Sequence, residues 1–146
     1  MYIISGAIAG VLGGGVFGAM MGALGMLPMV AQLVGSDNPM VGLMVHLIFS
    51  AVIGGIFAAV FGKRCTRLAE CAKLGTGYGV VWWVLGPLLI MPVALGMGPQ
   101  LSVSGISASV PSLMGHIVFG VILGATFPLI LGAFGGPGAK KEGAGS

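Results

Sequence analysis

Two histidines are the residues of this sequence whose type and spacing could support chemistry. His46 lies in the stretch GLMVHLIFS, and His116 lies 70 positions later in the stretch SLMGHIVFG; the chain has no other histidine. An imidazole can hydrogen-bond, move a proton near neutral pH, or ligate a haem-type iron. The matching surroundings of the two positions predict that the two rings have related roles.

The residues that follow each histidine form a stripe if the segment is helical. Side chains three, four, eight and eleven positions further on lie near one face of a helix. At both histidines this stripe reads His, Phe, small residue, Gly and Phe. Because lipid alone would not impose such a repeat, we expect both rings at equal depth on inward faces. The predicted lining residues are Phe49, Gly54, Phe119 and Gly124.

Four interpretations of the histidine pair stay open at this point. Each ring could hydrogen-bond a backbone carbonyl or serine of a neighbouring helix. Both could ligate one haem b between two helices, or one imidazole could ligate a chlorophyll-type pigment. A quinone head group is the fourth partner. The predicted outer half of the chain has no Lys or Arg to neutralise haem propionates, which disfavours joint haem ligation.

No other group of residues predicts an enzyme, a metal site or a nucleic-acid partner. Asp37 and Glu70 lie in predicted connections on opposite sides of the chain, so they cannot act as a carboxylate pair. Cys65 and Cys71 are too few for a zinc site. Both cysteines lie in the stretch KRCTRLAECAK, which we interpret as a connection with ordinary reduced loop thiols.

Composition identifies the elements that must position the histidines. The chain is 57% hydrophobic and 6% charged, whereas soluble domains are roughly 25% charged. Four stretches lack Asp, Glu, Lys and Arg, and each exceeds the about 20 residues that cross a hydrocarbon core. The sequence therefore predicts an all-α transmembrane four-helix bundle within residues 1–134. Its predicted helices are Ile3–Ala31, Met40–Gly62, Leu74–Met97 and Ser112–Phe134.

The four predicted helices indicate an internal duplication. An offset of 70 aligns the second helix with the fourth, and an offset of 64 aligns the first with the third. The repeats are residues 1–62 and 74–134. Because each contains two spans, both copies insert in the same sense. We therefore expect parallel repeats related by an axis along the membrane normal.

The first predicted helix contains a row of glycines at every fourth position. Glycine lowers helix propensity, but in lipid it lets helix backbones approach closely. We expect a tight packing interface along most of this helix. The glycines concerned are Gly6, Gly10, Gly14, Gly18 and Gly22.

The basic residues predict the orientation. All of them fall in the second connection or in the Gly-rich tail at 135–146, and with four spans these segments share a side with the N-terminus. The positive-inside rule makes that side cytoplasmic, in a bacterial inner membrane. The residues are Lys63, Arg64, Arg67, Lys73, Lys140 and Lys141.

Three stretches carry a resemblance to a known group of proteins. They read GLMVHLIFSAVIGGIFA, WWVLGPLLIMPVALGMG and SLMGHIVFGVILG. Together with the Gly-spaced first helix, the chain resembles a family of small four-helix prokaryotic integral membrane proteins with no established activity. The resemblance covers nearly the whole chain, and the features it shares are His46, the run of Trp83, Met91 and Pro92, and the run of His116, Gly120 and Gly124. Phe119 stands where that pattern leads us to expect a tyrosine.

These features favour a non-catalytic integral subunit of a larger bacterial respiratory or photosynthetic complex. Its Gly-rich faces would dock other helices, so the expected partners are membrane lipid and either other integral subunits or a second copy of the chain. The main alternative is a tetrapyrrole-binding electron-transfer protein that uses His46 and His116. A small oligomeric transporter is the second alternative.

Overall fold

Four long apolar spans make up most of the part of the chain that the structure describes. The computed structural model describes residues 1–137, and every regular element in that range is helical. Four spans are long and apolar enough to cross a membrane: Tyr2–Ala23, Pro39–Phe61, Leu68–Ala94 and Val110–Ala133. The shortest has 22 residues, about 33 Å at 1.5 Å per residue, against a hydrocarbon core roughly 30 Å thick. The predictions of an all-helical fold and of four helices long and apolar enough to span a membrane are confirmed. Most of the predicted tail, from residue 138 on, lies outside the described residues.

The first span is shorter than predicted. Helix α1 comprises Tyr2–Ala23, and a separate short helix, α2, comprises Leu27–Gln32. Gly25 has a φ of 67°, a left-handed conformation that favours glycine and turns the backbone out of α1. Pro28 lies in the first turn of α2, where its missing N–H costs nothing. The prediction of one continuous helix, Ile3–Ala31, was wrong. It relied on hydropathy, and this turn lies inside an uninterrupted apolar run.

The third span differs from its prediction at both ends. It consists of α4 (Leu68–Trp83), the π-helical segment η1 (Val84–Ile90) and α5 (Met91–Ala94). It begins six residues before the predicted helix Leu74–Met97, because its first turns carry charged side chains that hydropathy assigns to a connection. Pro87 lies inside η1. Since proline has no N–H to donate, the wider π turn accommodates a residue that would break an α-helix.

The second and fourth spans agree with prediction to within two residues. Helix α3 comprises Pro39–Phe61 and helix α7 comprises Val110–Ala133. Asn38 caps α3, since its side chain accepts a 2.9 Å hydrogen bond from the Met40 backbone N–H. A short helix that was not predicted, α6 (Val103–Ala108), lies in the connection before α7.

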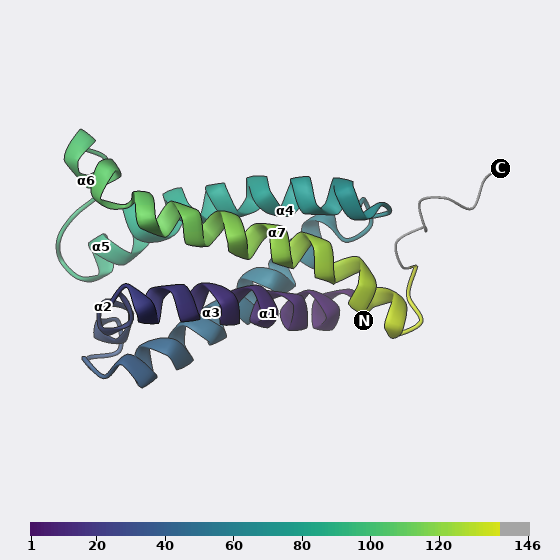
Figure 1. Ribbon diagram of the computed structural model, residues 1–146, viewed down its shortest axis with the longest axis horizontal. Helices are drawn as coiled ribbons and strands as arrows, with labels where there is room; N and C mark the ends of the chain where they lie inside the picture. Colours follow the sequence, from purple (N-terminus) through teal and green to yellow (C-terminus); the bar gives the residue numbers. More distant parts are fainter. Residues whose placement is uncertain (138–146) are drawn as a thin grey trace.

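In space the long helices follow the order α3, α1, α7, α4. Helix α1 packs on both α3 and α7, and α4 packs on the far side of α7 (Figure 1). The short α2 packs on α3. Helices α3 and α4 approach each other at few positions. As a result, the spans that contain α1 and α7 are 44% and 39% buried, whereas the span that begins with α4 is 17% buried.

Glycines bring the two helices of each pair into backbone contact. A Cβ added at Gly6 would collide with the Gly54 carbonyl oxygen, and one added at Gly10 would lie 3.0 Å from the Gly54 Cα. In the α4–α7 pair, a Cβ added at Gly75 would lie 2.9 Å from the Gly124 Cα. Both pairs therefore cross at points where only glycine fits. Of the five predicted interface glycines, Gly22 faces α2 and four face α3 of the same chain: Gly6, Gly10, Gly14 and Gly18.

Candidate functional site

His46 links α3 to α1. Its Nε2 lies 3.0 Å from the carbonyl oxygen of Gly14 on α1. A carbonyl oxygen only accepts, so Nε2 carries the hydrogen and donates, and Nδ1 keeps the lone pair. One turn further on, the Ser50 hydroxyl donates to the His46 carbonyl oxygen at 2.7 Å. The imidazole therefore makes an interhelical hydrogen bond. Gly14 has no side chain, so α3 can come close enough to α1 for this bond to form.

His116 hydrogen-bonds within its own helix instead. Its Nδ1 lies 2.8 Å from the Ser112 carbonyl oxygen, one turn earlier in α7. By the same reasoning Nδ1 donates there, and Nε2 has the lone pair. That Nε2 faces η1, where a Cβ added at Gly86 would lie 4.0 Å from it. The two histidines, which match in sequence, thus carry opposite tautomers and hold different partners.

Phe17 of α1 brings the two imidazoles into one cluster. Its ring centroid lies 5.0 Å from that of His46 and 4.8 Å from that of His116, in edge-on arrangements. Phe17 is 5% exposed. Sequence reasoning missed this residue, whose one signal is a large ring inside the glycine-rich run GGGVFG. The cluster of His46, Phe17 and His116 lies on three different helices, which only the bundle brings together.

The predicted lining residues lie elsewhere. Gly54 and Gly124 are two turns from the histidines, in backbone contacts with Gly6 and Cys71 respectively. Phe119 is 4% exposed, but its predicted counterpart, Phe49, is 48% exposed. The expectation that Phe49 faces the bundle was wrong, because α4 does not close over that side of α3 as α1 closes over α7.

The cluster does not fit one tetrapyrrole held by both histidines. A macrocycle between the two rings would have to displace Phe17, which contacts both of them. It would also break the hydrogen bond from His46 Nε2 to Gly14. Within residues 1–137, no group of three His, Cys, Asp or Glu side chains could hold a metal ion. His46 matches the interpretation of a hydrogen bond to a backbone carbonyl of a neighbouring helix, whereas His116 bonds a carbonyl of its own helix.

The two cysteines are buried, contrary to the expectation of loop thiols. Cys65 is 2% exposed in the connection, and Cys71 is 0% exposed on α4. Both are free thiols. Burial, with the neighbouring Cys71 thiol, raises the pKa of Cys65. The reactive thiolate is therefore disfavoured, and Cys65 serves as a small core residue.

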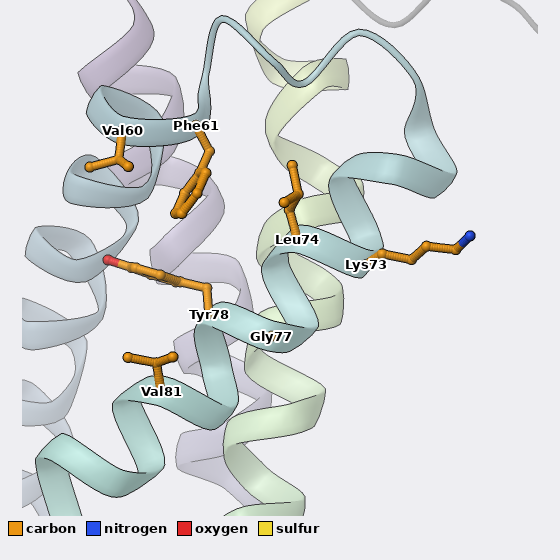
Figure 2. A pocket seen from close by; sticks show the side chains of 7 residues that line it. All are labelled: Val60, Phe61, Lys73, Leu74, Gly77, Tyr78 and Val81. Atoms are coloured by element: carbon orange, nitrogen blue, oxygen red, sulfur yellow. The ribbon is translucent and has the colours of Figure 1, made fainter.

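A groove between α3 and α4 is the feature that sequence reasoning missed entirely. Tyr78 extends from α4 across to α3, where its hydroxyl donates to the Ile53 carbonyl oxygen at 2.8 Å (Figure 2). Its ring contacts Phe57 and Phe61 of α3. The groove has a volume of about 560 Å³. Its lining residues are Val60, Phe61, Lys73, Leu74, Gly77, Tyr78 and Val81.

Comparisons with known proteins identify no relative of this chain. No protein-family model matches the chain, and it matches neither a curated protein nor a solved structure. The resemblance to small four-helix prokaryotic membrane proteins stays a prediction from the sequence.

Proposed function

We propose that the protein is a non-catalytic integral subunit of a larger complex in the bacterial inner membrane. The observation that carries the proposal is a row of small residues on the outer face of α1. Gly15, Ala19 and Ala23 follow one another at every fourth position, and all three are exposed. A Cβ added at Gly15 would meet nothing within 4 Å. In lipid, such a row lets a second helix approach closely enough for backbone contact.

This face differs from the one that the sequence favoured. Gly6, Gly10, Gly14 and Gly18 face α3, so they hold the chain itself together and are not free to dock another subunit. The row that begins at Gly15 belongs to the exposed face of α1, which also carries Val11, Leu12 and Val16. An adjacent subunit, or a second copy of this chain, would complete the packing of α1 there.

The proposal is tested by the substitution Gly15→Leu. The new side chain enters open space in the isolated chain, so the fold should survive while a docked helix is forced away. We expect the mass of the complex, extracted in mild detergent and measured on a native gel, to fall to that of the single chain. Gly77→Leu is the matched control. A Cβ at Gly77 also meets nothing within 4 Å, and this residue lies on a different helix, α4. An unchanged mass for Gly15→Leu would refute docking through α1.

The parallel two-helix repeat belongs to the proposal, and the helix contacts support it. Gly10 and Gly75 make corresponding contacts and are 65 positions apart; their partners Gly54 and Gly124 are 70 apart. The contacts thus follow an offset of 65 between the first and third helices, where the sequence had favoured 64. The transporter alternative stays a prediction that these contacts do not test.

We also propose the predicted membrane orientation, in which the connection between α3 and α4 faces the cytoplasm. The native cysteines are buried, so topology is better probed at the exposed positions Lys63 and Ser104. A membrane-impermeant maleimide added to intact cells should label Ser104→Cys and leave Lys63→Cys unlabelled until the cells are opened. Labelling of Lys63→Cys in intact cells would reverse the orientation.

A further inference from the structure

The groove between α3 and α4 has the length and lining of a site for one acyl chain. On α4 it extends from Lys73 to Val81, about 12 Å at 1.5 Å per residue. One leaflet contributes about half of the roughly 30 Å hydrocarbon core, so this length matches the depth of a single leaflet. A partner helix would instead need a contact along most of a span. The walls are aliphatic and aromatic, with Phe61 and Tyr78 facing each other (Figure 2).

The connection that joins the two walls of the groove is rich in basic residues. This connection between α3 and α4 arches over one end of the groove (Figure 2). Residues 62–73 contain four cations and one acidic residue, Glu70, and no other Lys or Arg occurs before residue 140. Lys73 lines the groove, and its ammonium points outward from the rim, away from Phe61 (Figure 2). Such a long stem can lie along apolar surface while its charge stays at the membrane interface. The four cations are Lys63, Arg64, Arg67 and Lys73, and all are exposed.

We propose that this groove binds an anionic glycerophospholipid, with an acyl chain against Phe61 and Tyr78 and the phosphate held by Lys73 and by the cations of the neighbouring connection. Basic pockets between transmembrane helices are suited to anionic headgroups, and a zwitterionic lipid would gain less from the same cations. Gly77 makes room for the chain, because it is exposed and no atom lies within 4 Å of where its Cβ would be. The inference does not depend on the subunit proposal, which concerns the exposed face of α1 and not α3 or α4.

Native mass spectrometry of the full chain in detergent, with a defined lipid added, tests the proposal. The probes are dioleoyl phosphatidylglycerol and dioleoyl phosphatidylcholine, compared at equal concentration. We expect one phosphatidylglycerol to be retained in clear preference to phosphatidylcholine. Lys73→Gln and Arg67→Gln should each weaken that preference about fivefold, which corresponds to about 1 kcal/mol per surface cation. Equal retention of the two lipids would overturn the proposal.

Two matched glycine variants locate the site. Gly77→Leu should fill the groove and abolish selective retention, whereas Gly15→Leu should retain phosphatidylglycerol like the wild type. Retention by Gly77→Leu would refute this location, and displacement by soluble glycerol phosphate would show that the headgroup binds without the chain. If a second polypeptide occupies the groove instead, Gly77→Cys should cross-link to it and no lipid should be retained, which would overturn the proposal. Loss of assembly in Gly15→Leu with lipid retained would separate the fate of this proposal from that of the subunit.

Discussion

The two interfaces that join the helix pairs are unlike, although a parallel duplication would make them equivalent. Helix α1 packs along α7, whereas α3 and α4 meet at few positions. At the closed interface, a Cβ added at Gly13 would lie 2.8 Å from the Phe119 carbonyl oxygen, and the ring of Phe17 covers Gly115. Close backbone approach at one glycine and a ring seated on another thus fill the space between α1 and α7.

The open interface has larger residues at the corresponding positions. With offsets of 65 and 70, Tyr78 and Trp82 on α4 correspond to Gly13 and Phe17, and Val45 on α3 corresponds to Gly115. Tyr78 therefore holds α4 away from α3 and spans the gap with its hydroxyl on the Ile53 carbonyl. Glycine at position 13 thus lets α1 pack closely on α7, while tyrosine at the corresponding position 78 leaves a groove between α4 and α3.

The largest expected effect comes from a substitution that prevents the two helices of one pair, α1 and α3, from packing together. Gly10→Leu should prevent α1 from packing on α3, because its side chain would collide with the backbone of Ser50 and Gly54. We expect a loss of more than about 3 kcal/mol in the free energy of unfolding, above the usual cost of overpacking, since backbone cannot move aside. Unfolding in mixed micelles measures it, with Gly15→Leu as the control. Stability equal to that of the control would contradict the described α1–α3 packing.

The second prediction converts the closed interface into the open one. Gly13→Tyr should push α1 from α7, at a cost of about 1–3 kcal/mol in the free energy of unfolding. Phe119, 4% exposed in the native chain, should then become accessible. A cysteine at position 119 should react with a lipid-soluble maleimide faster in the Gly13→Tyr background than in the native one. Equal reaction rates would mean that residue size at position 13 does not set the interface.

The third prediction separates the two histidines. His46→Ala and His116→Ala both remove a ring from Phe17, but only the former removes an interhelical hydrogen bond. We therefore expect His46→Ala to lower the free energy of unfolding by about 0.6 kcal/mol more, the average for such bonds in membranes. Neither change should alter the visible absorption of the purified protein. A Soret band lost in both variants would restore the haem interpretation.

The smallest effect is expected where the open interface is bridged. Tyr78→Phe keeps the ring against Phe57 and Phe61 and removes the hydrogen bond to Ile53. The loss should be about 0.6 kcal/mol or less, because the Ile53 carbonyl still accepts within its own helix. Comparison of unfolding free energies for Tyr78→Phe and Tyr78→Ala isolates the hydroxyl from the ring. A larger loss for the hydroxyl than for the ring would show that this bond, not the aromatic packing, joins α3 to α4.

The sequence by itself determined the number of spans and their apolar character, because charged side chains are costly in hydrocarbon and each uncharged run is long enough to cross it. It also located the glycines of α1 that contact α3, since a glycine at every fourth position defines a helix face without reference to a partner. It misplaced the ends of the first and third spans, where Gly25 turns the chain inside an apolar run and charged residues continue a helix. Hydropathy carries no information on either feature.

Only the tertiary structure decided which of two equivalent faces acquired a neighbour. Phe49 and Phe119 match in sequence, yet one is 48% exposed and the other is 4% exposed. The same holds for His46 and His116, whose local sequences are alike and whose hydrogen-bond partners differ. The physical reason is that a side chain becomes buried only when a second surface packs against it, and that surface comes from another helix. Whether Phe49 is covered depends on how closely α4 packs on α3, and no local pattern around Phe49 contains that information.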